Sequence, residues 1–289
     1  MQKVMITGIA GGFGKPTALA LLEKGYQVAG SVRSRDGKNV DTVAELEAAG
    51  ALIVAMDVTD TASTERGVAQ AIAHLTGIDV LFSNAGIGSY GIQELMTPED
   101  MARVFDVNVM GVQRVMRAAL PHMRAQKRGT VLHTSSLIGR IATPFYGTYA
   151  ASKWALEAIV ECYRTELSGF GIESCIIEPG AMPTAFFDGM VAPNDPKREA
   201  QYGEFAAVPA MSAVGLAQML DATPDQRPER IAEAVVDLLE MPFGQKPFRT
   251  VVDHVGVGPQ IERYNDVLHD VTRTVMTSFG IEDMLKLNA

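Results

Sequence analysis

The strongest constraint on the fold is an alternation of short, almost wholly apolar runs with longer stretches of helical periodicity. The apolar runs have the length of strands and cover residues 2–7, 26–32, 51–56, 78–83, 129–135, 172–178 and 248–253. The stretches between them predict helices at residues 14–24, 40–49, 61–75, 98–125, 147–169 and 227–240. Because the strands lack the polar alternation of a half-exposed sheet, both of their faces must be covered. The order of the elements therefore predicts a parallel α/β sheet with helices on both faces.

Two segments interrupt this alternation within a single domain whose core is 2–184 and 227–253. Residues 185–226 are rich in proline and small residues and are too long for an ordinary connection, which predicts a lid over a binding site. Residues 254–289 form an extension in which apolar residues recur in steps of three and four, as in an amphipathic helix. These residues are Ile261, Tyr264, Leu268, Val271, Val275 and Phe279. The helix is expected to pack on its own domain or a second subunit, or else to cover the substrate pocket.

Composition excludes several classes of function. The net charge of −9 at pH 7 disfavours the basic surface of a nucleic-acid-binding protein. No apolar run reaches the roughly 18 residues that cross a bilayer, and the N-terminus lacks signal-peptide architecture. The histidines show no metal-ligand spacing, and Cys162 and Cys175 are interpreted as buried small apolar residues. We expect a soluble cytoplasmic protein that binds neither a metal, nor nucleic acid, nor a membrane.

A glycine-rich turn follows the first predicted strand and opens the first predicted helix. It reads Thr7-Gly8-Ile9-Ala10-Gly11-Gly12-Phe13-Gly14 and satisfies both TGxxxGxG and TGxxGxxG. Glycines here let the backbone approach a pyrophosphate, whose charge then lies at the helix N-terminus. A plain tight turn without a ligand is the alternative, but four glycines cost backbone entropy that such a turn would not require. The turn predicts a dinucleotide site.

The end of the second predicted strand bears on which dinucleotide is bound. An NAD-binding protein usually places an acidic residue here to bind the ribose 2′-hydroxyl, but this chain has Val32 followed by Arg33. A guanidinium suits the 2′-phosphate of NADP, which favours NADP(H) over NAD(H). Arg33 as a solvated loop residue, and Asp36 as a ribose ligand, remain alternatives. After the third strand, Asp57-Val58 could place a carboxylate at an adenine, or Asp57 could be a helix cap or surface residue.

A possible proton-transfer pair lies on the helix predicted over 147–169. Tyr149 and Lys153 are four residues apart, which places both side chains on one face of the helix. A phenol has an unperturbed pKa of about 10, and a nearby ammonium favours its ionised form. The pair can therefore act as a tuned proton donor or acceptor, although the spacing alone is also common by coincidence.

With these pieces placed, residues 2–253 resemble the short-chain dehydrogenase/reductase family. The matching motifs are the glycine turn at 7–14, Asp57-Val58, Asn84-Ala85-Gly86, Asn108, Ser135-Ser136, Tyr149-Ala-Ala-Ser-Lys153 and Pro179-Gly180-Ala181-Met182-Pro183-Thr184. The resemblance implies a Rossmann-type doubly wound fold with a seven-stranded parallel sheet. TGxxGxxG spacing marks a branch with epimerases and dehydratases, but the other motifs favour the oxidoreductase branch.

The resemblance also implies roles for individual residues. Tyr149 would exchange a proton with the substrate oxygen, Lys153 would lower the tyrosine pKa and bind the nicotinamide ribose, and Ser136 would orient the substrate oxygen. Asn108 would hold a water that links Lys153 to solvent, or would instead satisfy backbone groups at a helix kink. Residues assigned to the cofactor are Thr7, Gly8, Gly12, Phe13, Gly14, Arg33, Asp57, Val58, Asn84, Ala85, Gly86, Tyr149, Lys153, Pro179, Gly180, Met182 and Thr184.

The residues expected to face the substrate are mostly apolar, which suits a medium or large carbonyl or alcohol. They are Ser136, Ile138, Phe145, Tyr146, Tyr149, Phe186 and Phe187. We expect an NADP(H)-dependent carbonyl reductase or alcohol dehydrogenase. The alternatives are an NAD-dependent catabolic dehydrogenase and a non-catalytic NADPH-binding sensor. The helices over 98–125 and 147–169 resemble those that form dimer faces in the family, which implies a homodimer or homotetramer.

Overall fold

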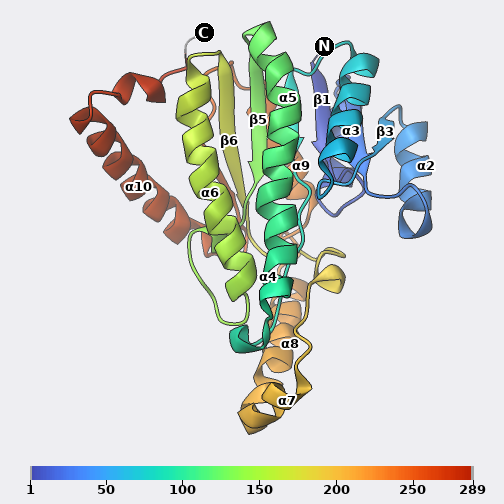
Figure 1. Cartoon of the computed structure of the whole chain (residues 1–289), viewed down its shortest axis with the longest axis vertical. Coiled ribbons are helices and arrows are strands. Elements are labelled where there is room, and N and C mark those ends of the chain that lie inside the picture. Colours follow the sequence, from blue (N-terminus) through green and yellow to red (C-terminus); the bar gives the residue numbers. More distant parts are fainter. Residues whose placement is uncertain (1, 288–289) are drawn as a thin grey trace.

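The computed structural model describes residues 2–287 and contains one seven-stranded sheet. The strands are β1 (Lys3–Thr7), β2 (Gln27–Val32), β3 (Leu52–Ala55), β4 (Val80–Ser83), β5 (Gly129–Thr134), β6 (Ile172–Pro179) and β7 (Arg249–Val252). Their order in space is β3-β2-β1-β4-β5-β6-β7, and every neighbouring pair is parallel. The sheet confirms the predicted Rossmann-type fold (Figure 1), and each observed strand lies within its predicted range except β6, which extends one residue further, to Pro179.

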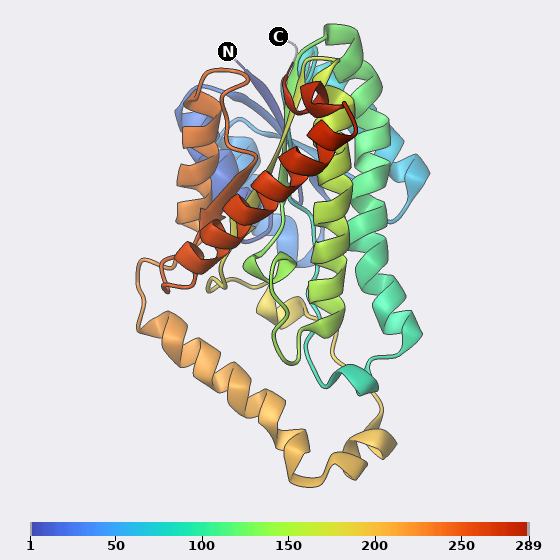
Figure 2. The same ribbon diagram turned by 90° about the vertical axis from the view of Figure 1, so that its left-hand side faces the viewer.

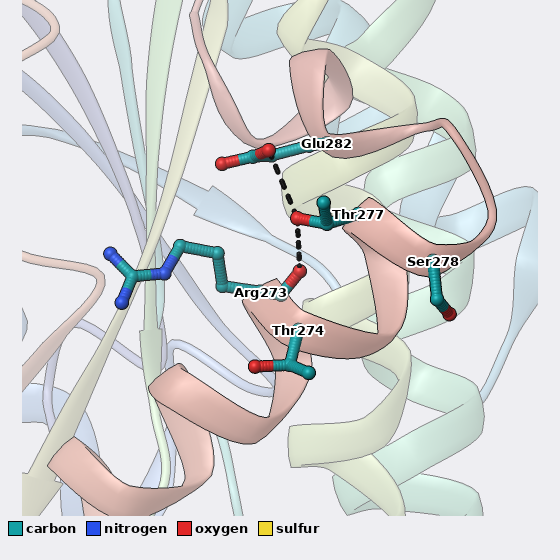
Figure 3. A pocket seen from close by; sticks show the side chains of 5 residues that line it. All are labelled: Arg273, Thr274, Thr277, Ser278 and Glu282. Carbon is teal, nitrogen blue, oxygen red and sulfur yellow. Dashed lines mark hydrogen bonds between the residues drawn. The ribbon is translucent and has the colours of Figure 1, made fainter.

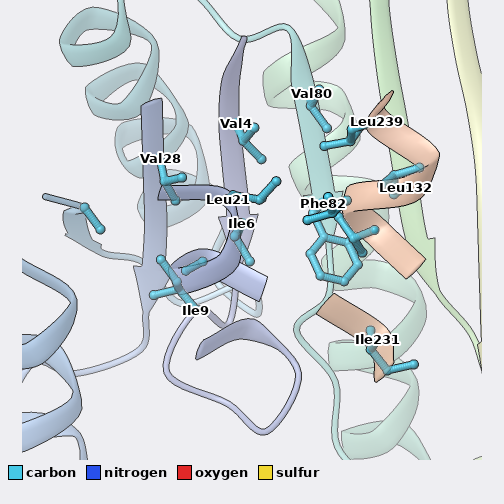
Figure 4. Packing of buried hydrophobic residues seen from close by; sticks show 14 of the residues in the cluster. Val4, Ile6, Ile9, Leu21, Val28, Val80, Phe82, Leu132, Ile231 and Leu239 are labelled. Atoms are coloured by element: carbon cyan, nitrogen blue, oxygen red, sulfur yellow. The ribbon is translucent and has the colours of Figure 1, made fainter. Parts of the chain in front are cut away.

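Helices cover both faces of the sheet, as the uninterrupted apolar strands require. One face packs against α1 (Gly14–Glu23), α2 (Val40–Ala48) and α9 (Glu229–Glu240). The other face packs against α3 (Thr61–Leu75), α5 (Val112–Gln126) and α6 (Gly147–Ser168). In Figure 4, Leu21 of α1 and Ile231 of α9 lie with strand residues of the first face.

Neighbouring residues of one strand enter opposite halves of the core because strand side chains alternate between faces. In β1, Val4 and Ile6 pack toward α1 and α9, whereas Met5 packs toward α3 and α5, and all three are fully buried. Burying a side chain of this size contributes roughly 1.5–3 kcal/mol relative to leaving it exposed. Continuous apolar strands therefore stabilise a sheet only when both layers of helices are present.

The helix predicted over 98–125 is three joined segments rather than one. Helix α4 (Pro98–Phe105) begins with a capping box between Thr97 and Asp100, and it passes through a π-helical segment, Asp106–Gly111, into α5. A π-helical turn does not alter the apolar spacing strongly enough to be read from the sequence. Such turns are frequent at functional sites, and this one carries Asn108.

The segment interpreted as a lid is mostly helical. It contains α7 (Pro196–Glu199), a 3₁₀ segment (Ala200–Ala207) and α8 (Val208–Asp221). Figure 2 shows these elements extending away from the sheet and its two layers of helices. Among the residues of α8, Leu220 is buried, while Met211 and Val214 are 70% and 57% exposed.

The extension forms the predicted helix, α10 (Gly258–Ser278). The residues that are buried on it differ from the apolar residues that the sequence pattern placed on one face. Ile261 and Asn265 are buried, whereas Val271 and Phe279 are 52% and 71% exposed. The helix runs obliquely across the view in Figure 2 and contacts β7, and its buried residues lie in its first turns. The polar Asn265 takes an inward position because it bonds a buried carboxylate, described below.

Three other observations bear on the sequence predictions. Cys175 is buried as expected, but Cys162 is exposed, because it lies half a turn of α6 away from the inward-facing Val160. Across residues 2–287, no group of three or more His, Cys, Asp or Glu side chains has an arrangement that could hold a metal ion. Among the described helices, none combines the length and the apolar character that a bilayer-spanning segment needs.

Candidate active site

The candidate site lies at the carboxyl ends of β1, β4 and β5, where the strand order reverses direction between β1 and β4. Open α/β sheets bind ligands at such a point. Thr7 at the end of β1 accepts hydrogen bonds from the backbone N–H groups of Asn84 (2.9 Å) and Ala85 (3.0 Å). The Asn84 side chain donates to the Thr7 carbonyl (3.2 Å) and accepts from the Thr134 hydroxyl (3.2 Å). These bonds fix three strand ends as one polar frame.

The key glycines of the turn occupy positions where a side chain would be strained or would collide with neighbouring protein atoms. Gly8 has a φ of +68°, which favours glycine. A Cβ on Gly14 would collide with the Gly8 carbonyl oxygen, and one on Gly12 would lie 2.6 Å from the Thr184 Cβ. Helix α1 follows with no side-chain cap from Phe13 and no acidic residue in its first turn. Its first N–H groups are therefore suited to a pyrophosphate.

Arg33 and Asp57 lie on the edge predicted to hold the adenosine. Arg33 is exposed and, within residues 2–287, takes part in no ion pair, whereas Arg35 bonds the Ile53 carbonyl and Glu47. Burial raises the pKa of the Asp57 carboxyl. Hydrogen bonds from Thr59 and the charge of Arg33 lower it by more than burial raises it, so the net pKa lies below its ordinary value. Arg33 thus acts on Asp57 electrostatically and is free to meet another anion.

The two residues of the proton-transfer pair are buried on α6. Tyr149 is 8% exposed and Lys153 is 4% exposed, and the Lys153 ammonium lies 5.7 Å from the centre of the Tyr149 ring. Lys153 Nζ donates a 2.8 Å hydrogen bond to the Thr134 carbonyl at the end of β5. Burial lowers the pKa of Lys153 to about 8, against an opposing effect of the Glu157 charge. The lysine therefore titrates near neutral pH.

The pKa of Tyr149 is shifted in the direction opposite to the sequence expectation. Burial is the largest influence and raises the pKa of the phenol, Tyr146 raises it further, and a hydrogen-bonding interaction with Ser136 lowers it. Ser136 is therefore among the groups that act on the phenol, and its catalytic role remains a prediction. Ser136 caps the short 3₁₀ segment Leu137–Gly139, accepting from the Ile138 N–H at 3.4 Å.

Asn108 is buried and bonds the backbone on the far side of the site. Its side-chain amide accepts from the Ile87 N–H (2.9 Å), and it donates to the Ile87 carbonyl (2.8 Å) and the Ser152 hydroxyl (3.0 Å). A Cβ on Gly86 would lie 3.2 Å from Asn108 Oδ1 and 3.7 Å from Lys153 Nζ, so these three residues converge. The side chain thus satisfies backbone groups beside a helix irregularity, and a water-holding role remains a prediction.

The segment after β6 carries the residues expected to anchor the nicotinamide end. Its N–H at Gly180 donates to the Val252 carbonyl (2.9 Å), Met182 is 2% exposed, and Thr184 lies against Gly12. Gln226, which no sequence motif singled out, donates a 2.7 Å bond to the Ala181 carbonyl. Gln226 thereby ties the end of the lid to the cofactor edge.

Two groups of aromatic rings lie among the residues predicted to face the substrate, and one of them packs against Tyr149. The Phe186 ring centre lies 5.5 Å from that of Tyr149 and 5.9 Å from that of Phe187. Phe145 has a φ of +70°, a strained value for a residue with a side chain, which is commonest at functional sites. Burial, and then the nearby Tyr90, raises the pKa of Tyr146 to about 12.

Tyr90 is a site residue that the sequence reasoning missed. Its ring lies 4.7 Å from that of Tyr146 and 6.0 Å from that of Phe145, and its hydroxyl donates to the Pro209 carbonyl (2.8 Å). Residues 88–91 also bond the base of the lid through Val191. Its position in the sequence could have indicated it, because Tyr90 lies in the loop that leaves β4 directly after Asn84-Ala85-Gly86.

A surface hollow of about 440 Å³ lies elsewhere, along α10. It is lined by Arg273, Thr274, Thr277, Ser278 and Glu282 (Figure 3). The Thr277 hydroxyl donates to both the Arg273 carbonyl (2.8 Å) and Glu282 (2.9 Å). These polar groups already satisfy one another, and none comes from an element that carries a residue of the candidate site.

Comparison with known proteins agrees with this geometry. A family model described as short chain dehydrogenase matches residues 2–194. The 3-ketodihydrosphingosine reductase of Bacteroides thetaiotaomicron is 37% identical over 65% of this chain and 66% of its own length, so the match spans about two thirds of that protein. Mouse 17-beta-hydroxysteroid dehydrogenase type 1 is 32% identical over 83% of this chain and 70% of its own. A short-chain dehydrogenase from Streptomyces avermitilis has 28% identity and a TM-score of 0.76, covering 97% of this chain and 98% of its own.

Proposed function

The chain belongs to the short-chain dehydrogenase/reductase family, and we accordingly propose that it transfers hydride between NADP(H) and a largely apolar carbonyl or secondary alcohol compound. Members of this family are oxidoreductases that use a nicotinamide cofactor. The observation that carries the proposal is the buried pair of Tyr149 and Lys153, in which the ammonium lies 5.7 Å from the phenol ring centre and is held by the Thr134 carbonyl at the end of β5.

The residues of the site divide the chemistry between them. A nicotinamide cofactor would supply the hydride when bound, and the glycine turn and Thr184 would hold it. Tyr149 gives a proton to the carbonyl oxygen during reduction, or removes one from the alcohol during oxidation. Ser136 donates to the same oxygen as negative charge develops. Lys153, held by the Thr134 carbonyl, places a positive charge next to the phenol when the tyrosine ionises.

The walls of the site favour an apolar substrate. Phe186 packs against the Tyr149 ring, and Tyr90 packs against Phe145 and Tyr146, which immediately precede the helical turn that carries Tyr149. Among the described residues, Lys153 lies over the Tyr149 ring, but no lysine or arginine lies over the rings of Tyr90, Phe145, Tyr146 or Phe186, which disfavours a carboxylate or phosphate substrate there. The names of two relatives, a 3-ketodihydrosphingosine reductase and a 17-beta-hydroxysteroid dehydrogenase, accord with a ketone or hydroxyl group on a lipid-like molecule.

NADP(H) is the proposed cofactor because Arg33 is exposed and uncommitted while Arg35 is committed to Glu47. Solved relatives differ in this respect: an alcohol dehydrogenase of Thermococcus sibiricus is a complex with 5-hydroxy-NADP, and an NADH-dependent reductase is a complex with NAD. The alternative, an NAD-dependent dehydrogenase of catabolism, would make the guanidinium of Arg33 dispensable for binding.

We also propose a homodimer or homotetramer. Met110 before α5 and Trp154 on α6 are 52% and 42% exposed, and both lie on the helices implied as dimer faces. Large apolar side chains that are exposed on a helix face are typical of subunit contacts. Light scattering measures the mass directly, and a monomer would contradict the proposal.

The test of the proposed activity is the absorbance of NADPH and of NADH, followed with ketones and aldehydes graded in size and polarity. Apolar substrates of medium or large size are expected to give the highest kcat/KM with NADPH. Activity confined to small charged carbonyls would overturn the substrate class, and tight cofactor binding without turnover on any substrate would favour a binding protein instead.

A further inference from the structure

Four buried charged residues form a cluster next to the segments that carry Ser136 and Lys153. The ionic cluster consists of Arg140, Glu157, Glu178 and Arg249, and no member has more than 8% of its side chain exposed. Its ion-pair distances are Arg140–Glu157 3.0 Å, Arg249–Glu157 3.1 Å, Arg249–Glu178 3.4 Å and Arg140–Glu178 3.6 Å. Glu157 therefore touches both cations.

Three members of the ionic cluster come from segments that carry catalytic or cofactor residues. Arg140 follows Ser136 by four residues, directly after the 3₁₀ segment that Ser136 caps. Glu157 follows Lys153 by four residues on α6, which places it one turn away on the same face. Glu178 immediately precedes Pro179 at the end of β6. The cluster thus joins the serine, the lysine and the cofactor-binding segment from behind.

The contacts are tight around Glu157. A Cβ on Gly139 would lie 3.4 Å from Glu157 Oε1, so the 3₁₀ segment packs directly on this carboxylate. Burial, and then the Glu157 charge, raises the pKa of the Glu178 carboxyl. Asn265 of α10 donates a 2.5 Å hydrogen bond to Glu178. Glu157 is the carboxylate closer to the two guanidinium groups, at 3.0 and 3.1 Å against 3.6 and 3.4 Å for Glu178.

Such a cluster is costly to bury. Desolvating several charges can exceed their mutual attraction, and well-packed apolar residues are often as stable in their place. A purely structural contact would not require four charges here. Their position next to the two catalytic segments points instead to a role in the site.

We propose that Glu157 is a positioning residue, which holds the Ser136 segment through Arg140 and keeps Lys153 in its ammonium form. This inference rests on the proposed function. The charged and titratable groups that face Glu157 or Lys153 are Arg140 after β5, His133 on β5, Glu178 on β6, Arg249 on β7, and Tyr149 and Glu161 on α6. Glu157 is the carboxylate among them that acts on Lys153 and opposes the effect of burial.

The test compares Glu157→Gln with Glu161→Gln in the full-length protein. Both carboxylates pair with Arg249, but Glu161 is partly exposed and lies a further turn from Lys153. In E157Q the alkaline limb of kcat is expected to move to lower pH by about one unit, because the ammonium loses its anion. Its kcat at pH 8 is expected to fall about tenfold with the cofactor KM changed by less than about twofold. E161Q is expected to keep the wild-type limb.

A readout without turnover separates this inference from the proposed function. Proteins labelled with ¹⁵N at lysine Nζ report the titration of Lys153 by NMR, and a Lys153→Met variant assigns the signal. A titration that moves down in E157Q and not in E161Q supports the inference, even if no substrate is turned over. An unmoved titration in folded E157Q overturns it, even if the enzyme is active. If E157Q does not fold, Glu157→Asp is measured instead, because it keeps the carboxylate but moves it away from Lys153 by the length of one methylene. Movement toward lower pH in E157D then supports the inference, and no movement overturns it.

Discussion

The cofactor edge and the substrate side of this site are built by different interactions. At the cofactor edge, Thr7 and Asn84 join strand ends through bonds of 2.9–3.2 Å, and glycines leave no room for a Cβ. On the substrate side, aromatic rings meet at 4.7–6.2 Å, and α8 leaves Met211 70% exposed. A rigid polar frame suits a cofactor of fixed shape, whereas aromatic and methionine side chains adapt to substrates of different shape.

The largest expected effect lies where the two regions meet. Tyr149→Phe removes the proton donor and should lower kcat by about 10²–10⁴-fold, while the dissociation constant of NADPH stays nearly unchanged. Stopped-flow turnover and fluorescence titration measure the two quantities. Tyr146→Phe is the matched control, because Tyr146 lacks a lysine one turn on, and its effect on kcat should be small. Equal activity of the Tyr149 variant would contradict the assigned role.

The rigidity of the cofactor edge is tested at Gly12. In Gly12→Ala the new Cβ would lie 2.6 Å from the Thr184 Cβ, so the turn or the segment after β6 must move. Overpacking of this kind costs about 1–3 kcal/mol, which corresponds to roughly a five- to hundredfold weaker Kd for NADPH. Gly169→Ala is the control, since a Cβ added there would meet no neighbouring atom within 4 Å. Equal Kd values for both variants would show that this edge adapts as the substrate side does.

His133 on β5 of the sheet is expected to make the stability of the fold depend on pH. Burial, and then the Lys153 charge, lowers the pKa of this histidine to about 3, and within residues 2–287 neither ring nitrogen has a hydrogen-bond partner. The folded chain keeps His133 neutral, whereas the unfolded chain binds a proton below about pH 6.5. Stability is therefore lost as the pH falls from about 6.5 toward 3.

His133→Leu should remove that loss. The free energy of unfolding of the variant minus that of the wild type is expected to be about 2 kcal/mol larger at pH 5 than at pH 8. Urea unfolding at both pH values measures the gain. His74→Gln, at an exposed position of α3, is the control and should leave the pH dependence unchanged. An identical pH dependence in His133→Leu would show that other groups account for acid unfolding.

The choice of cofactor depends on one arginine at the outer end of the cofactor edge. Arg33→Ala should weaken NADPH binding about tenfold or more and leave NADH binding unchanged, because the guanidinium would meet only the 2′-phosphate. Arg35→Ala is the control, since Arg35 is committed to Glu47 and the Ile53 carbonyl. Equal losses for both cofactors in Arg33→Ala would favour the NAD alternative.

The contrast between the cofactor edge and the substrate side also explains which features could be predicted from the sequence and which could not. The strands and the polar motifs of the cofactor edge follow from local chemistry, because apolar runs, glycines and strand-end residues are adjacent in sequence. The π-helical turn at Asn108, the exposure of Cys162 and the buried line of α10 depend on packing between distant segments. So does the raised pKa of Tyr149, because burial in the folded chain outweighs the opposing effect of Ser136. Tyr90 was missed for the same reason.

The smallest expected effect concerns how the substrate side is held to the lid. Tyr90→Phe keeps the ring against Tyr146 but deletes the 2.8 Å bond to the Pro209 carbonyl at the start of α8. One such bond is worth about 1 kcal/mol, so KM for a bulky ketone should rise about fivefold while kcat changes little. Tyr163→Phe, which loses a bond to Gln113 on the far side of α6, is the control and should leave KM unchanged. A fall in kcat without a change in KM would place Tyr90 with the rigid frame rather than with the adaptable wall. The division between the two regions would then run through the aromatic cluster itself.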